Sequence, residues 1–311
     1  NYEFNTEVIK DGIIKNGIIY GPNGSGKTNF GLALFDIVNH LGQKWRKLDY
    51  YANFVYVGKL NVPVEFEYVF KDADRIINYC YSKNNIGQLL TEKLSVDNIL
   101  VFERTARTFN TSYPLAKNHY LLTVLQFVDS MLWFRCLDTR EFIGLDLAPT
   151  NLDEYIIQNN LVKDFSEFLH QVSDQKYQFA NPRPNDKLLV CKIGGRDVIF
   201  DKIISTGTNA LMLLYFWIQK MRSASFVFID EFDAFYHFKL AFEVCKRLFA
   251  LDCQVFTSSH NTYLMTNDLL RPDCNFIVNN NKIKPLSACT QKELRFGHNI
   301  EKLFRGNAFQ L

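Results

Sequence analysis

Residues Gly21 to Thr28 read G-P-N-G-S-G-K-T and directly follow the apolar run Ile18-Ile19-Tyr20. This is the phosphate-loop pattern G-x-x-x-x-G-K-[ST], in which glycines let successive backbone N–H groups point at a polyphosphate. Because the motif requires a strand before the loop and a helix after it, the beginning of the chain is restricted to an α/β arrangement. We therefore expect a bound nucleoside triphosphate. The alternative is a glycine-rich turn before an amphipathic helix.

The loop assigns a role to each of its polar side chains. Lys27 is expected to reach the β- and γ-phosphate oxygens, and the Thr28 hydroxyl is expected to bind Mg²⁺. The helix that begins near Lys27 directs the positive end of its dipole at the same anion. The other residues expected to contact the nucleotide are Gly21, Asn23, Gly24, Ser25, Gly26 and Asn29.

Composition restricts the class of protein. The 311 residues are 47% hydrophobic and include 28 Phe and 15 Tyr, which favours a packed globular protein. A net charge of +2 gives no reason to expect a polyanionic partner from bulk charge alone. Seven cysteines without a C-x-x-C pair favour reduced thiols in a cytoplasmic protein, and no apolar stretch is long enough to suggest a membrane partner.

A second acidic motif completes the expected site. The apolar run Phe226–Ile229 ends in Asp230 and Glu231, as in a buried parallel strand that delivers two carboxylates to one edge of a sheet. Asp230 is expected to hold Mg²⁺, as a Walker B aspartate does, and Glu231 to orient or deprotonate the attacking water. The alternative is an ordinary strand that ends in a charged turn. Lys27 and Asp230 are separated by most of the chain, a spacing typical of ABC-type ATPase heads and too long for a small GTPase.

Two further loops fit this class. Ser205-Thr206-Gly207-Thr208 precedes an expected helix, so Ser205 and Gly207 are candidates for a signature loop that contacts the γ-phosphate of a second subunit. A simple helix cap is the alternative for this loop. His260 follows the strand Val255–Phe256 and is expected to hydrogen-bond the γ-phosphate, although a structural histidine is the alternative. Asp233 is expected in the D-loop, at a dimer seam.

The chain resembles the ABC-like heads of the SMC, RecF and OLD group in the strings Y-G-P-N-G-S-G-K-T-N, S-T-G-T, F-I-D-E-F-D and T-S-S-H-N-T. The segment from Leu286 to Phe309 is similar to that of AAA-type ATP-binding proteins in bacterial anti-phage operons, such as the ATPase subunits of PARIS, Septu and abortive-infection or retron systems. The chain departs from transporter subunits in its T-G-T signature and in having no legible Q-loop, for which Asn53 is a weak candidate. It has no long coiled coil, and the roughly fifty residues after His260 are too few for a Toprim nuclease domain.

This resemblance implies an α/β P-loop NTPase of the ABC-ATPase head type, with a mixed sheet, an antiparallel β subdomain and a helical insertion. The expected domains are an N-terminal ATPase lobe (1–117), a helical insertion (118–185) and a C-terminal lobe (186–311). Alternation predicts antiparallel strands near 62–70, 75–81, 89–94 and 99–102, and a hairpin between 187 and 200. Helix is expected from Asn118 to about Val172, with a capping box at Thr150 and Asp153.

The implied function is that of a Mg²⁺-dependent ATPase. It would form a homodimer around ATP and control a separate effector, a nuclease toxin, in response to a phage protein or nucleic-acid trigger. A RecF-like repair head that closes on duplex DNA, and a transporter motor, are the alternatives. The apolar segment 118–169 and the basic residues near the C-terminus are candidate partner surfaces, against an intradomain lid and a solvated helix. These basic residues are Lys292, Arg295, Lys302 and Arg305.

Overall fold

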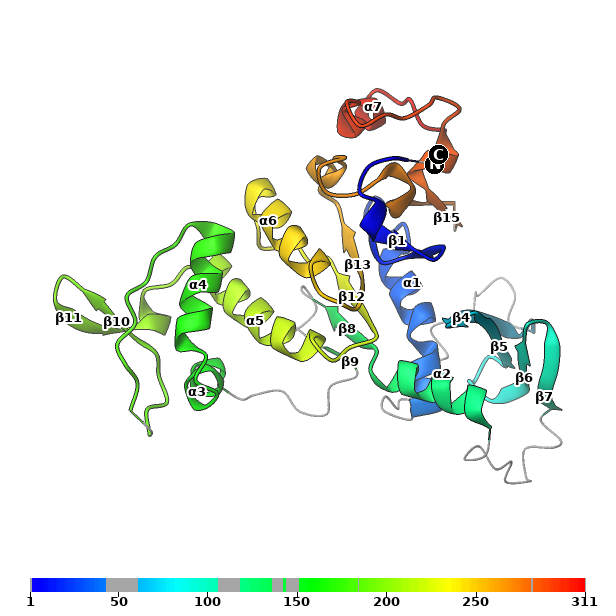
Figure 1. The fold of residues 1–311 in the computed structure, drawn as a ribbon, viewed down its shortest axis with the longest axis horizontal. Helices are drawn as coiled ribbons and strands as arrows, with labels where there is room; N and C mark the ends of the chain where they lie inside the picture. Colours follow the sequence, from blue (N-terminus) through cyan, green and yellow to red (C-terminus); the bar gives the residue numbers. More distant parts are fainter. Residues whose placement is uncertain are drawn as a thin grey trace. The chain divides into compact units, whose positions relative to one another are not determined.

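The computed structural model describes residues 2–42, 61–105, 118–135, 142–143, 151–183, 185–280 and 282–310 (Figure 1). The chain forms two compact units, one made of residues 1–31 and 132–311 and the other of residues 32–131. The division between them falls inside helix α1 (Lys27–Leu34), which directly follows the phosphate loop.

A mixed sheet is the centre of the first unit. Its described strands follow the order β15-β14-β3-β13-β12-β8-β9, and the five inner strands are parallel to one another. Every residue of β3 and β12 is buried, which explains why neither strand alternates between apolar and polar residues. The strands are β3 (Asn16–Tyr20), β8 (Leu132–Arg135), β9 (Phe142–Ile143), β12 (Phe226–Asp230), β13 (Gln254–Ser259), β14 (Asn275–Asn279) and β15 (Lys282–Pro285).

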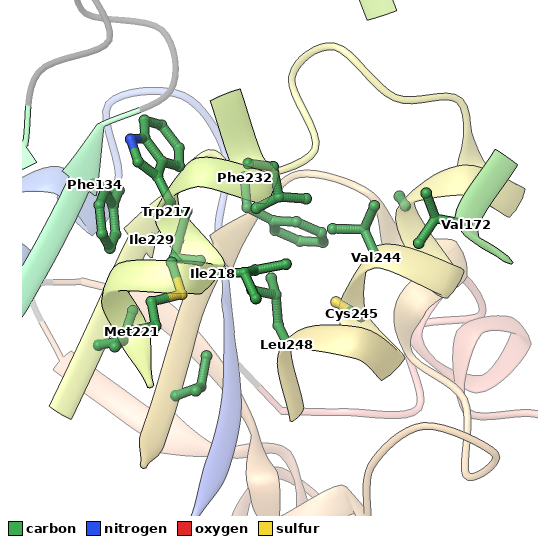
Figure 2. Close-up of a cluster of buried hydrophobic side chains, with 14 of the residues drawn as sticks. Phe134, Val172, Trp217, Ile218, Met221, Ile229, Phe232, Val244, Cys245 and Leu248 are labelled. Carbon is green, nitrogen blue, oxygen red and sulfur yellow. The ribbon is translucent and has the colours of Figure 1, made fainter. Parts of the chain in front are cut away.

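Helices α5 (Thr206–Met221) and α6 (Phe238–Phe249) supply much of the core of this unit. Figure 2 shows Trp217 and Met221 of α5 and Leu248 of α6 gathered with Ile229 of β12. Burial of each such side chain contributes about 1.5–3 kcal/mol. Among the described residues, the other α-helices wholly within this unit are α3 (Leu152–Gln158), α4 (Val162–Ser173) and α7 (Ile300–Arg305).

Helix α1 approaches the sheet closely at a glycine. A Cβ atom added to Gly31 would lie 2.6 Å from a ring carbon of Phe228 and 3.0 Å from one of Trp133. These two aromatic residues are paired partners on β12 and β8. The absent side chain therefore allows the start of α1 to pack directly on the strands that carry the acidic motif.

Two small hairpins complete the first unit. Strands β1 (Ile9–Lys10) and β2 (Ile13–Ile14) form one, and β10 (Val190–Ile193) and β11 (Arg196–Ile199) form the other. The turn of the second hairpin is Gly194-Gly195, with φ of 56° and 78°. This confirms the hairpin predicted between 187 and 200, because a two-residue turn with positive φ at both positions matches the twist of the strands.

The expectation of helix from Asn118 to Val172 is wrong at residues 132–135 and 142–143, which form strands β8 and β9. Helix α2 ends at Asp129, and the next described element, β8, is a parallel neighbour of β12 in the core sheet. Leu132–Arg135 has three apolar residues before an arginine, too short a run to show a period that distinguishes a buried strand from a buried helix, so its neighbours in the fold decide.

The start of α3 also differs from the expected capping box. Its N-cap is Asn151, whose side chain accepts the N–H groups of Asp153 and Glu154 at 3.0 and 3.3 Å. Asp153 accepts the N–H of Leu189 at 3.0 Å. The predicted cap residue Thr150 lies outside the described residues.

The second unit contains an antiparallel sheet of β4 (Val64–Asp72), β5 (Arg75–Lys83), β6 (Leu89–Val96) and β7 (Ile99–Thr105), paired in chain order. The predicted antiparallel strands are therefore confirmed. Helix α2 (His119–Asp129) belongs to the same unit, and its Phe127 ring makes an edge contact with Phe70 of β4, at 5.4 Å between centroids.

Several side chains of this sheet form polar contacts with low exposure to solvent. Asp36 accepts from the Lys83 ammonium at 2.7 Å and from the Tyr81 hydroxyl at 2.6 Å. Glu92 accepts from the Tyr79 hydroxyl and from the Arg104 guanidinium. Burial alone would raise the pKa of Glu92, but hydrogen bonds from His40, Arg104 and Tyr79 outweigh it and lower the pKa to about 2.

None of the helices in the described part of the chain combines the length and apolar character needed to cross a lipid bilayer.

Candidate nucleotide-binding site

The candidate site lies at the carboxyl ends of three adjacent parallel strands. Tyr20 at the end of β3 pairs with Ser259 of β13, and Ile229 near the end of β12 pairs with Thr257 of β13. The segments that follow these strands therefore leave the same edge of the sheet, the edge at which open α/β sheets bind ligands. They begin with Gly21, Glu231 and His260, and Asp230 is the last residue of β12.

The phosphate loop has the backbone that its glycines predict. Gly24 and Gly26 have φ of 76° and 101°, which other residues adopt only with strain. A Cβ on Gly21 would lie 2.4 Å from the Ser25 hydroxyl oxygen. That oxygen is buried and has no hydrogen-bond partner among the described residues. The backbone of the loop therefore favours glycine at positions 24 and 26, and a side chain at position 21 would require Ser25 to shift.

Lys27 is folded into the loop. Its ammonium donates to the carbonyl of Gly21 at 2.8 Å and to that of Pro22 at 3.2 Å. Burial lowers the pKa of Lys27, and the negative charges of Glu231 and Asp230 act in the opposite direction. The ammonium thus lies within the electrostatic influence of both acidic residues.

The two halves of the predicted metal site meet. The Thr28 hydroxyl donates to Asp230 Oδ2 at 2.7 Å, although 202 positions separate the two residues. A hydroxyl beside a carboxylate is a donor set suited to Mg²⁺, a hard cation that prefers oxygen ligands. This contact fits the metal role predicted for Thr28 and Asp230.

Glu231 lies beside the predicted switch histidine. Its carboxylate is 3.5 Å from His260 Nε2, and the two side chains are 25% and 40% exposed. Glu231 has φ of 50°, in the left-handed region that non-glycine residues rarely occupy. A base for water activation must be reachable by solvent and substrate, and Glu231 is more exposed than Asp230, whose exposed fraction is 5%.

Asp233 is held by the strand that carries His260. Its carboxylate accepts from the Ser259 hydroxyl at 2.7 Å, and Ser259 in turn accepts the N–H of Asn261 at 2.9 Å. Burial raises the pKa of Asp233, and the hydrogen bond from Ser259 partly offsets this. The predicted D-loop residue is therefore connected to the predicted switch loop.

The predicted signature residues begin a long helix. Ser205 is the N-cap of α5, and its hydroxyl accepts the Thr208 N–H at 3.1 Å. Ser205 and Gly207 line a pocket of 540 Å³ together with Gln175 and His237. Its described lining includes no residue of the phosphate loop and neither Asp230 nor Glu231. The helix-cap role is thus seen within this chain, and contact with a second subunit stays a prediction.

A separate pocket of 350 Å³ borders the phosphate loop. Gly21 and Pro22 form one part of its lining, and Ser259 and His260 form another. Phe304 of α7 also lines it. Space therefore exists beside the loop where it faces the predicted switch residue.

Two residues near the candidate site were not predicted from the sequence. The Ser258 hydroxyl donates to Asp230 Oδ1 and accepts the Glu231 N–H at 2.8 Å. Arg135 pairs with Asp230 in the register of β8 and β12, and its guanidinium lies 5.6 Å from the Trp133 ring centroid. Ser258 could have been identified from the sequence because it lies two residues before His260, near the end of strand β13. Arg135 could be found only after β8 was recognised as a strand.

Two weaker expectations have different outcomes. Asn53, the weak Q-loop candidate, lies outside the described residues. In the basic segment near the C-terminus, Arg295 pairs with Glu293 at 2.8 Å and Arg305 pairs with Glu301 at 2.6 Å. These ion pairs neutralise part of the charge that made the segment a candidate partner surface.

No protein-family model matches the chain, and no curated protein matches it. Solved structures match it over most of its length. An SMC head bound to the C-terminal winged-helix domain of ScpA is 18% identical, with a TM-score of 0.53 over 86% of this chain and 88% of that chain. An SMC head domain from Pyrococcus furiosus, with an extended coiled coil and bound to the C-terminal domain of ScpA, is 14% identical, with a TM-score of 0.51 over 86% and 88%. The chain therefore has the fold of SMC head domains, which is the ABC-ATPase head type that its motifs predict.

Proposed function

We propose that the protein is a Mg²⁺-dependent ATPase of the ABC-head type that dimerises around ATP. The observation that carries this proposal is the hydrogen bond between Thr28 and Asp230, since it joins two motifs from distant parts of the chain at one oxygen-rich point. The backbone of the phosphate loop and the SMC-head fold support the same function.

Each residue of the proposed site would have a separate role in binding or hydrolysing ATP. Thr28 and Asp230 would hold Mg²⁺, which neutralises phosphate charge when it is bound. Lys27 would bind the β- and γ-phosphates, while Glu231 orients or deprotonates water and His260 hydrogen-bonds the γ-phosphate. In a dimer, Ser205, Gly207 and Asp233 would complete the site of the neighbouring subunit.

Two variants test this proposal. Lys27→Ala removes the phosphate-binding cation, so ATP affinity should fall by at least about tenfold in a fluorescence titration. Glu231→Gln keeps the shape of the side chain but removes the base, so it should bind ATP, accumulate as a dimer in light scattering, and turn over slowly. Unchanged affinity in the first variant, or wild-type turnover in the second, would contradict the assigned roles.

We further propose that the ATP-bound dimer controls a separate effector, a nuclease toxin, in anti-phage defence. Support for this part comes from the sequence resemblance of the segment from Leu286 to Phe309. Purification of the chain with the product of its neighbouring gene, expressed together from the native operon, tests it. A nuclease that is inactive in the complex and active after phage infection is the expected result.

A DNA-binding head of the SMC or RecF kind is the second candidate. The likeness to SMC heads favours it, because that fold is shared over most of the chain. This function predicts an affinity for duplex DNA that increases with ATP and decreases with salt. DNA binding without an associated nuclease would select this candidate over an effector-controlling ATPase.

A further inference from the structure

Ser258 contacts both acidic residues of the candidate site through one hydroxyl group. Its side chain is fully buried in β13, between the strands that carry the phosphate loop and the acidic motif. The oxygen donates to Asp230 Oδ1 and accepts the backbone N–H of Glu231 at 2.8 Å. A serine hydroxyl has one donor and two acceptor sites, so both bonds form at once.

The first bond determines the orientation of Asp230. With Oδ1 bound to Ser258, the other oxygen, Oδ2, faces Thr28 and accepts its hydroxyl at 2.7 Å. Asp230 is 5% exposed, so few water molecules can replace a lost donor. Loss of the Ser258 hydroxyl would leave a buried carboxylate oxygen with one partner fewer and would free the rotation of the group.

The second bond stabilises an unfavourable backbone conformation. Glu231 has φ of 50°, and for an L-residue this region costs free energy relative to the strand or helix regions. The hydrogen bond from its N–H to Ser258 offsets part of that cost and fixes the point at which the chain turns from β12. The Glu231 carboxylate thereby stays close to His260, at 3.5 Å from Nε2.

We propose that Ser258 is a positioning residue that sets the geometry of Asp230 for the metal and of Glu231 for water. This inference rests on the proposed ATPase function and adds a residue to it. A hydroxyl that only satisfied a strand end would affect folding stability. Ser258, by contrast, affects Mg²⁺ dependence and turnover, while nucleotide contacts made by the phosphate loop persist.

Three variants test the proposal. Ser258→Ala removes both hydrogen bonds, and Ser258→Thr keeps a hydroxyl at the same carbon. Thr257→Val is the matched control, because the Thr257 hydroxyl is buried one residue away and has no hydrogen-bond partner among the described residues. Circular dichroism establishes that each variant is folded. Ser258→Cys, nearly isosteric and a weak hydrogen-bonder, replaces Ser258→Ala if the alanine variant is not folded.

The measurements are steady-state ATP hydrolysis across a Mg²⁺ series and the binding of a mant-labelled ATP analogue with Mg²⁺ or with EDTA. For Ser258→Ala we expect kcat to fall by about tenfold or more and the Mg²⁺ concentration for half-maximal activity to rise several-fold. Affinity for the analogue in EDTA should change by less than about twofold, since Lys27 is untouched. Ser258→Thr should recover part of kcat, and Thr257→Val should behave like the wild type.

The possible results distinguish a failure of the positioning role of Ser258 from a failure of the proposed ATPase function. Wild-type turnover with an unchanged Mg²⁺ profile in Ser258→Ala would overturn the positioning role alone. Equal losses in Ser258→Ala and Thr257→Val would overturn it too, because they would show a general effect of strand packing. A wild-type chain that binds no analogue would overturn the ATPase function and the role of Ser258 with it.

Discussion

The hydroxyl of Thr28 donates to Asp230 Oδ2 at 2.7 Å and so joins the start of helix α1 to the end of strand β12. Hydroxyl and carboxylate oxygens are the kind of ligand that Mg²⁺ prefers, and here the two oxygens are in direct contact. This contact makes the proposed metal site the most direct place to test the proposed function.

Thr28→Val keeps the shape of the side chain and removes the hydroxyl, whereas Thr28→Ser keeps the hydroxyl. We expect Thr28→Val to raise the Mg²⁺ concentration for half-maximal ATP hydrolysis by at least about tenfold, since a metal ligand and a partner of Asp230 are lost together. Thr28→Ser should stay close to the wild type. A Mg²⁺ titration of activity measures both, and equal profiles for the two variants would remove Thr28 from the metal site.

Gly31→Ala should lower the melting temperature. Alanine is normally better than glycine inside a helix by about 1 kcal/mol. Here its Cβ would lie 2.6 Å from the Phe228 ring and 3.0 Å from that of Trp133, so buried aromatic residues must shift. Overpacking of this kind costs about 1–3 kcal/mol and outweighs the gain in propensity.

Gly297→Ala is the control for this effect, because its new Cβ would meet no atom within 4 Å. Thermal unfolding followed by circular dichroism compares the two variants. A Gly31→Ala variant as stable as Gly297→Ala would show that α1 can move away from the sheet without cost.

Glu92→Gln should destabilise the antiparallel unit at neutral pH. The pKa of Glu92 is lowered to about 2, so its charged form stabilises the folded state at every pH above the ordinary glutamate value. The loss on substitution should be about 2–3 kcal/mol at pH 7. It should shrink as the pH falls from about 4.5 toward 2, where the wild-type carboxylate becomes protonated.

The control is Glu65→Gln, on the exposed face of β4, which should change stability by less than about 0.5 kcal/mol. Urea unfolding at several pH values measures both variants. A Glu92→Gln deficit that does not depend on pH would assign the effect to packing rather than to charge.

Asp233→Asn should increase stability at neutral pH, whereas Glu92→Gln should decrease it. Burial raises the pKa of Asp233, so the folded state disfavours its charge, and wild-type stability falls as the pH rises from the ordinary aspartate value through the raised one. Asparagine can still accept the Ser259 hydrogen bond without that charge. The variant should be more stable than the wild type at pH 7 and equal to it below about pH 3.8, as followed by urea unfolding.

Local patterns predicted much of this protein. The phosphate loop was legible because its glycines and Lys27 have fixed spacing, and β12 was legible because a buried parallel strand is apolar until its acidic end. The antiparallel strands were found because one face of that sheet is exposed, as Glu65 and Glu67 are. Each of these features depends on residues adjacent in sequence.

The features that were missed depend on neighbours distant in sequence. The run Leu132–Arg135 is too short to show a period, and its pairing with β12 makes it a strand. Ser258 looks like any polar residue at a strand end. Its importance comes from the register that places it beside Asp230 and Glu231, and sequence spacing does not contain that register.

The strand order of the core sheet also affects how the chain can fold during its synthesis. Strand β13 separates β3 from β12, so the phosphate loop and the acidic pair reach their final spacing only once residues 254–259 are inserted between them. During synthesis, the two motifs can therefore meet only after residues 254–259 have emerged from the ribosome. A ligand of the proposed site can stabilise only chains that already contain β13, and shorter intermediates depend on their own local contacts or on chaperones.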